Sequence, residues 1–290
     1  MQRQDFRCFH RLRVRWAEVD IQKIVFNAHY LTYADCAMTE YWRALALPYE
    51  AAMQALGGET YLKKASVEYH ASARLDDLLD LGLHCARIGT TSLVFECGVF
   101  AGDRLLATIE LVYVFADPQT QTKRPVPAQL RAIIEHYEAG GEMVELRVAD
   151  WATLGRDATA LRMAVFVDEQ QIDPAEELDA HDASAVHAVA YNRLGQPVAT
   201  GRLLYEAPGD ARIGRMAVDR VLRGQCWGRM VLDALVHAAR QRGDAQVTLH
   251  AQRSAEGFYQ RAGFEVLGEP FEEVGIPHIT MRQVFDLLSN

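Results

Sequence analysis

Residues 223–228 read Arg223-Gly224-Gln225-Cys226-Trp227-Gly228 and lie between a strand-like segment, Ile213-Gly214-Arg215-Met216-Ala217-Val218, and a helical one that continues through Val236. A glycine-containing turn that runs into a helix N-terminus aims several backbone N–H groups at one point and adds the positive end of the helix dipole. Arg223 adds a full charge. This layout is typical of a diphosphate site, although an ordinary strand followed by a capped helix has the same order.

A second strand follows this helix, and after it the chain reads Phe258-Tyr259-Gln260-Arg261-Ala262-Gly263-Phe264. Together with the turn at residues 223–228, this stretch resembles the core of the GCN5-related N-acetyltransferases (GNAT). Residues 161–170, 251–252 and 275–279 resemble the ElaA-like branch of that family, so the resemblance covers roughly residues 144–285. It implies a mixed sheet flanked by helices, with acetyl-CoA or acyl-CoA as a substrate and no permanently bound cofactor.

The GNAT resemblance also implies roles for individual residues. Tyr259 would be the general acid for the departing CoA thiolate, because a phenol with an unperturbed pKa near ~10 stays protonated at neutral pH. Cys226 stands where the family usually has a second glycine, and its side chain either crowds the diphosphate or tilts the turn. The implied CoA contacts are Arg223, Gly224, Gln225, Cys226, Trp227 and Gly228, with the backbone N–H groups of Met216, Ala217 and Val218 at the thioester carbonyl.

The sequence does not identify the base that deprotonates the acceptor amine. Gln252 resembles a substrate-side position of the ElaA-like group, and a strand-end amide that caps a loop explains it equally well. His181 and His187 lack a companion at ligand spacing, so we predict no metal site. The candidate bases, each of which also has a structural explanation, are Glu169, Asp179, Asp182, His187, Glu272 and His278.

The first half of the chain has a different pattern. A strand at residues 10–16 and a loop at 17–27 precede an apolar-faced helix at 29–46. Strand-like segments follow at residues 63–73, 79–88, 92–101 and 104–116, and a short amphipathic helix at 128–138. One helix wrapped by a long antiparallel sheet is the fold that this order predicts.

The loop and helix start read Asp20-Ile21-Gln22-Lys23-Ile24-Val25-Phe26-Asn27-Ala28-His29-Tyr30-Leu31. This stretch resembles the hotdog-fold acyl-CoA thioesterases of the 4-hydroxybenzoyl-CoA thioesterase-like group, in which an Asp precedes an apolar triplet and a Tyr on the central helix. Residues 69–77 and 91–96 fit the same family, so the resemblance covers about residues 5–138. Lys23 replaces a common glycine of the family, and Asn27 stands where one branch has His.

The thioesterase resemblance implies that Asp20 either attacks the thioester carbonyl or deprotonates a water that does so. Backbone N–H groups around Asn27, Ala28 and His29 would stabilise the oxyanion, with Tyr30 beside them in the acyl pocket. Simple capping of a helix start is the alternative for these residues. In the resembling enzymes the pocket lies between two units, so we expect a homodimer or tetramer assembled through this half.

Length and composition set the limits of these hypotheses. The 290 residues fit two domains, and Gly140-Gly141 after the amphipathic helix place the boundary between residues 1–140 and 141–290. A formal charge of −9 argues against a nucleic-acid partner. Five cysteines without Cys-x-x-Cys spacing predict neither disulfides nor zinc and favour a cytoplasmic protein, and no apolar run is long enough for a membrane span.

Two functional hypotheses therefore stand. In the first, the chain is a bifunctional enzyme that hydrolyses acyl-CoA in its N-terminal half and transfers an acetyl or acyl group from CoA to an amine in its C-terminal half. In the second, only one half is catalytic, and the other is a CoA-binding, regulatory or oligomerising module.

Overall fold

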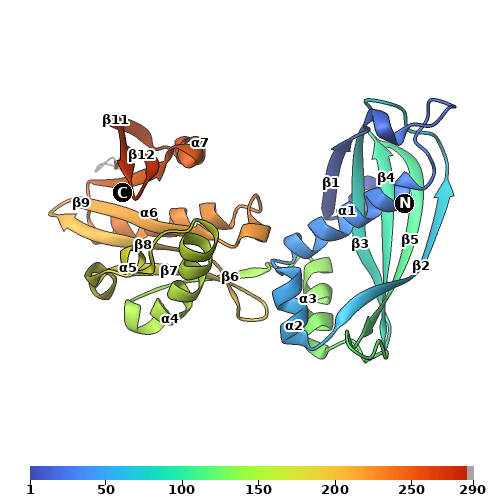
Figure 1. Cartoon of the computed structure of the whole chain (residues 1–290), viewed down its shortest axis with the longest axis horizontal. Helices are drawn as coiled ribbons and strands as arrows, with labels where there is room; N and C mark the ends of the chain where they lie inside the picture. The colour runs from blue at the N-terminus through green and yellow to red at the C-terminus, as the bar shows by residue number, and fades with distance from the viewer. Residues whose placement is uncertain (286–290) are drawn as a thin grey trace. The chain divides into compact units, whose positions relative to one another are not determined.

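The computed structural model describes residues 1–285 and shows two compact units, Met1–Met143 and a second unit that begins at Val144 (Figure 1). The last helix of the first unit ends at Glu138, and Gly140 follows it with a φ of 87°, in the left-handed region that glycine adopts without strain. The chain thus changes unit close to the glycine pair that marks the boundary in the sequence.

The first unit is one antiparallel sheet packed against a long helix, α1 (His29–Ala44). The strand order is β1-β3-β4-β5-β2. The helix wrapped by a long antiparallel sheet that the sequence predicts is confirmed. The strands are β1 (Cys8–Arg13), β2 (Glu59–Tyr69), β3 (Leu78–Ile88), β4 (Ser92–Ala101) and β5 (Arg104–Ala116), and the other helical segments are η1 (Arg3–Asp5), η2 (Trp16–Glu18), α2 (Tyr49–Leu56) and α3 (Ala128–Glu138).

Helix α1 forms because its large side chains recur every three or four residues. This spacing puts them on one face, which is buried against the sheet. The buried residues of α1 are Tyr30, Tyr33, Ala34, Ala37, Met38, Tyr41 and Trp42.

Two strands of the first unit begin and end earlier than the sequence predicts. Strand β1 stops at Arg13, because Trp16–Glu18 turns into a 3-10 helix held by the buried Glu18. Strand β2 stops at Tyr69, and the following loop is fixed at Ala73, whose N–H donates to the Tyr30 hydroxyl at 3.1 Å and whose carbonyl accepts from the Val25 N–H at 2.9 Å.

The second unit is built on a mixed sheet of order β11-β12-β10-β9-β8-β7-β6. Only β9 and β10 run parallel; the other neighbours are antiparallel. The mixed sheet with flanking helices is confirmed. Its strands are β6 (Val144–Ala149), β7 (Val186–Asn192), β8 (Pro197–Ala207), β9 (Asp210–Val218), β10 (Gln246–Gln252), β11 (Glu265–Glu273) and β12 (Ile276–Val284).

Helices cover this sheet and prepare the site. Helix α6 (Trp227–Arg242) packs on β7, β8 and β9 through buried Val231, Leu232 and Leu235. The remaining segments are α4 (Trp151–Arg162), the π-helix η3 (Met163–Glu169), α5 (Pro174–Glu177), η4 (Ala180–Ser184), η5 (Arg220–Leu222), η6 (Arg253–Ala255) and α7 (Glu256–Arg261). Within residues 1–285, no helix has both the length and the apolar character that crossing a bilayer requires.

Candidate functional site

The two parallel strands of the second sheet separate partway along their length. Strands β9 and β10 pair from Asp210 and Gln246 up to Ile213 and Leu249, and no later residue of either strand pairs with the other. From Gly214 and His250 onward the inner edges of both strands are therefore without a β-partner. An opening of this kind exposes backbone N–H and C=O groups to a ligand that lies between the strands.

A bulge lies in β9 beside the opening. The register between β8 and β9 shifts between Thr200 and Arg202, and Arg215 adopts a left-handed φ of 53° there. Bulges are common next to active sites, because they redirect the backbone at one point of a sheet. Arg215 and Met216 both lie within the shift, and Met216 is the first of the three residues expected to polarise a thioester carbonyl.

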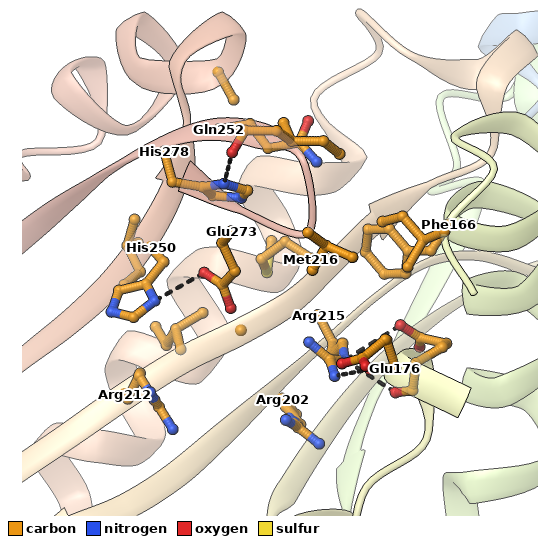
Figure 2. Close-up of a pocket in the computed structure, with 18 of the residues that line it drawn as sticks. Phe166, Glu176, Arg202, Arg212, Arg215, Met216, His250, Gln252, Glu273 and His278 are labelled. Carbon is orange, nitrogen blue, oxygen red and sulfur yellow. Dashed lines mark hydrogen bonds and ion pairs between the residues drawn. The ribbon is translucent and has the colours of Figure 1, made fainter. Parts of the chain in front are cut away.

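A cavity of about 310 Å³ lies at this opening. Its walls come from segments far apart in the chain: the π-helix η3, α5, strands β8, β9, β10 and β12, and helix α7. Figure 2 shows the labelled side chains around it. Among the candidate site residues named from the sequence, the cavity brings together Asp179, Met216, Gln252, Tyr259 and His278. Ala217, Val218 and the turn at residues 223–228 do not line it.

The turn before α6 has the features of an anion site. Cys226 is the N-cap of α6, and among residues 1–285 the backbone N–H groups of Gly224, Cys226, Trp227 and Gly228 have no protein acceptor. Free N–H groups at a helix N-terminus together with the helix dipole favour a phosphate. Gly228 packs closely, since a Cβ there would lie 3.1 Å from the Val218 side chain.

The structure gives a reason for the usual glycine at position 226. Cys226 has a φ of 66°, in the left-handed region, and its side chain is exposed. Both Gly224 and Cys226 thus have positive φ in one short turn. Lys23 in the first unit repeats this situation, since it replaces a common glycine and has a φ of 60°.

Arg223 is not available as a free charge at the turn. Its guanidinium makes two hydrogen bonds of 2.6 Å to the Glu169 carboxylate and a third to the Val218 carbonyl at 3.3 Å. The hydrogen bond to Arg223 lowers the pKa of Glu169. Glu169 is therefore a poor proton acceptor, and the pair ties the end of η3 to the turn.

Tyr259 lies on α7 with its ring buried between Phe258, at 4.9 Å, and Phe264, at 6.0 Å. Its hydroxyl has no hydrogen-bond partner among the described residues, and Tyr259 lines the cavity. Burial raises the pKa of Tyr259 to about 12. The phenol is therefore protonated at neutral pH, as the general-acid role requires.

Two candidate bases, Asp179 and Asp182, belong to an ion-pair network beside the cavity, and Asp179 itself lines the cavity. Asp182 accepts from Arg162 at 2.8 Å and from Arg202 at 2.7 Å, and Asp179 accepts from Arg202 at 2.6 Å. Burial alone would raise the pKa of Asp179, but hydrogen bonds from Arg202 outweigh it and lower the pKa to about 2. These carboxylates have a structural role, because removing one partner of a buried ion pair leaves the charge of the other partner buried without compensation.

The histidine candidates differ in their surroundings. His187 is buried against Trp151, its Nε2 lies 3.0 Å from the Asp182 carbonyl, and burial lowers its pKa. His278 lines the cavity, and its Nδ1 lies 2.8 Å from the Ile276 carbonyl. Glu272 is exposed and outside the cavity. Gln252 does line the cavity, where its amide donates to Gln170 at 2.9 Å.

A hydrogen bond at the cavity joins two residues that are not among the candidates named from the sequence. His250 and Glu273 both line the cavity, and His250 Nδ1 lies 3.1 Å from a Glu273 carboxylate oxygen (Figure 2). Alternation along β10 was an available signal, since it places His250 and Gln252 on one face. No sequence pattern connects residue 250 with the hairpin residue 273.

In the first unit, Asp20 lies in a tight loop closed by a bridge between Val19 and Val25. Its Oδ1 accepts from the Gln22 N–H at 2.8 Å, and its carbonyl accepts from the Lys23 N–H at 2.9 Å. The second carboxylate oxygen has no partner among the described residues. Asp20 thus has a structural role in the turn and one oxygen left for a substrate or a water.

The start of α1 offers hydrogen-bond donors near the end of this loop. In the described part of the chain, the N–H groups of Asn27 and Ala28 have no acceptor, whereas that of His29 donates to the Phe26 carbonyl at 2.9 Å. Tyr30 is buried, and its hydroxyl accepts from the Ala73 N–H. The N–H groups of Asn27 and Ala28 are therefore better placed than that of His29 to stabilise an oxyanion. Tyr30 has a structural role, because its hydroxyl holds the loop at Ala73.

No group of three or more His, Cys, Asp or Glu side chains within residues 1–285 is arranged to hold a metal ion.

Comparison with known proteins separates the two halves in the same way. The acetyltransferase (GNAT) domain model matches residues 155–285, and the thioesterase superfamily model matches residues 22–108. The N-acetyltransferase YjcF of Bacillus subtilis, itself uncharacterised, is 35% identical over 129 residues, which are 44% of this chain and 91% of YjcF.

Two solved structures resemble one half each. Escherichia coli ElaA is 30% identical, with a TM-score of 0.45 over 49% of this chain and 99% of ElaA. Slr0204, a 1,4-dihydroxy-2-naphthoyl-CoA thioesterase from Synechocystis, is 18% identical, with a TM-score of 0.41 over 44% of this chain and 94% of Slr0204.

Proposed function

Because the chain belongs to the GNAT family through its second unit and to the thioesterase superfamily through its first, we propose that it is a bifunctional acyl-CoA enzyme. The second unit transfers an acetyl or acyl group from CoA to an amine. The first unit hydrolyses acyl-CoA thioesters. CoA thioesters enter both reactions as substrates, and neither reaction requires a resident cofactor.

The separation of β9 from β10 beside free N–H groups at the start of α6 supports the transferase most strongly. The diphosphate of CoA would bind the N–H groups of Gly224, Cys226, Trp227 and Gly228. The pantetheine arm would then pass between the diverging strands, where the unpaired edge of β9 offers N–H groups to the thioester carbonyl. The reacting carbon would reach the cavity that Tyr259 lines.

The transfer requires two proton movements besides the acyl shift. The acceptor ammonium loses a proton before its nitrogen attacks, and the CoA thiolate gains one when the C–S bond breaks. Tyr259 supplies the second proton. The same cavity presents Gln252 to the acceptor side.

The test is amine-dependent formation of an amide from acetyl-CoA, followed by mass spectrometry over a panel of primary amines. Amide must be measured rather than free CoA, because hydrolysis in the first unit also releases CoA. Amide formation that depends on both acetyl-CoA and protein supports the proposal. No amide with any amine, from protein that binds CoA in calorimetry, would contradict it.

Hydrolysis in the first unit rests on Asp20 and the unpaired N–H groups of Asn27 and Ala28. The free carboxylate oxygen of Asp20 would attack the thioester or activate water, and the two N–H groups would bind the oxyanion. The assay is release of CoA from short and aromatic acyl-CoAs without an amine. Release in the wild-type protein that Tyr259→Phe retains would assign hydrolysis to the first unit.

If only one of the two activities is found, the second hypothesis holds, and the silent unit binds CoA or mediates assembly. We infer assembly through the first unit, because β1 and β2 are unpaired edges of its sheet and Trp16 and Ile21 are 80% and 99% exposed. The five cysteines are all free, which supports a cytoplasmic location.

A further inference from the structure

His250 lies at the point where the two parallel strands separate. Leu249 is the last residue of β10 paired with β9, and His250 is the next one. The His250 ring lines the cavity and packs edge-on against Phe271, with 5.0 Å between the ring centroids. An acceptor amine that meets a thioester emerging between β9 and β10 would arrive at this position.

The contact with Glu273 fixes which nitrogen of His250 can accept a proton. An ionised carboxylate only accepts hydrogen bonds, so Nδ1 must carry the hydrogen in the 3.1 Å contact with Glu273. The lone pair of the neutral ring is then on Nε2, for which no partner exists among the described residues. A carboxylate that holds an imidazole in this tautomer also stabilises the imidazolium that forms on proton uptake.

Two of the arginines around His250 are paired with other carboxylates. From β9, Arg212 is paired with Glu206 at 2.8 Å, and beyond the end of β10, Arg253 is paired with Glu256 at 2.8 Å. From β12, the register places His278 and Arg282 on the same face as His250. His278 donates to a backbone carbonyl. Among the described residues, Glu273 is the one carboxylate that forms a hydrogen bond with the His250 ring.

Three other carboxylates near the cavity are held by arginines. Glu169, which does not line the cavity, is bound to Arg223, and Asp179 is bound to Arg202. Glu177 is buried and bound to Arg162. An imidazole is also the side chain whose unperturbed pKa is nearest to neutral pH, where a base can both accept and release a proton.

We propose that His250, oriented by Glu273, is the proton acceptor for the incoming amine, an inference that rests on the transferase activity proposed above. The ammonium R–NH3⁺ gives one proton to His250 Nε2, and the neutral amine attacks the thioester carbonyl. The C–N bond forms and the C–S bond breaks, the thiolate takes the Tyr259 proton, and the second amine proton restores Tyr259 through water. The imidazolium releases its proton to solvent, so amide, CoA thiol and one proton are the products.

The experiment compares His250→Gln, Glu273→Gln and a control, His237→Gln, on the full chain. His237 lies on the exposed face of α6, away from the cavity. We expect His250→Gln to lower kcat/KM for amide formation by about 10²-fold or more and to remove the acidic limb of its pH profile. Glu273→Gln, which acts through His250, should lower kcat/KM less and shift that limb to lower pH, while His237→Gln changes neither.

Added imidazole provides a readout that a structural role would not produce. With His250→Gly, free imidazole should restore part of the amide formation, and CoA affinity in calorimetry should match the wild type. An unchanged pH profile in His250→Gln, or a variant that imidazole does not rescue although it binds CoA, overturns this inference alone. A wild-type protein that forms no amide with any amine overturns the proposed transferase function and this inference with it.

Discussion

Replacing Tyr259 by Phe separates its proposed chemical role from its packing role. The ring is 8% exposed and contacts Phe258 and Phe264, and a Phe ring keeps these contacts. The hydroxyl has no described protein partner, so its removal leaves no buried group unsatisfied. We therefore expect the free energy of unfolding to change by less than about 1 kcal/mol.

The effect on transfer should be much larger. General acid catalysis contributes about 10²- to 10⁴-fold, and each tenfold corresponds to about 1.4 kcal/mol in activation free energy. Because burial raises the pKa of Tyr259 to about 12, the phenol is a weaker acid than an ordinary thiol, and we expect the lower end of this range, about 10²-fold in kcat. The proton is lost only as the pH rises through about 12, so Tyr259 should produce no alkaline limb below about pH 10.

The assay measures kcat for amide formation, CoA affinity by calorimetry and the melting temperature of both proteins. We predict that kcat falls while the CoA affinity and the melting temperature stay close to the wild-type values. An unchanged kcat would remove Tyr259 from the mechanism. A variant that no longer binds CoA or melts far lower would make Tyr259 a packing residue.

Three further changes test other parts of the structure. Asp20→Asn should keep the fold and remove most acyl-CoA hydrolysis, because an amide is neither a base nor a nucleophile here; undiminished turnover of a panel of acyl-CoAs would contradict this. Cys226→Gly should leave the free energy of unfolding unchanged or raise it by up to about 1.5 kcal/mol, since the left-handed φ of 66° costs about 1–2 kcal/mol for a side chain and the backbone entropy of glycine costs about 0.5–1 kcal/mol. CoA should bind Cys226→Gly at least as tightly, and a weaker complex in calorimetry would show that the thiol helps the site. A fragment that ends at Gly141 should be oligomeric in light scattering and one that begins at Glu142 monomeric, whereas a monomeric first fragment that still hydrolyses acyl-CoA would refute assembly as a requirement.

The elements that local patterns determine were predicted well. Strands β4 and β5 and helix α3 have the bounds that alternation and amphipathic spacing predict. Helix α2 was missed, although Pro48 precedes it and Gly57, with a φ of 71°, ends it. The π-helix η3 was also missed, because its apolar pattern does not differ from that of an ordinary helix.

The site depends on contacts between distant residues, which the sequence could only partly predict. The turn before α6 and Tyr259 could be named, because each lies in a contiguous motif. The Arg223–Glu169 pair joins residues 54 positions apart, and the His250–Glu273 pair residues 23 positions apart. These two pairs form because the tertiary structure brings together η3, β10 and the hairpin of β11 and β12 around the cavity. No local spacing in the sequence encodes that arrangement.

The sequence shows two positions at which this chain lacks a glycine common in the resembling families, but it does not show the structural effect of the replacements. Lys23 and Cys226 suggested either blocked sites or tolerated changes. The structure shows both residues in the left-handed region, with φ of 60° at Lys23 and 66° at Cys226. Backbone conformation, rather than space for a ligand, is thus a sufficient physical reason for glycine at both positions.

The proposed transferase requires that CoA bind along the start of α6 and between β9 and β10. A crystal structure of the protein with CoA would show whether it does. We predict the diphosphate on the N–H groups of Gly224, Cys226, Trp227 and Gly228, and the thiol end of pantetheine between Met216 and Tyr259. Diphosphate density away from this turn, or β9 and β10 closed against each other with CoA bound elsewhere, would contradict it.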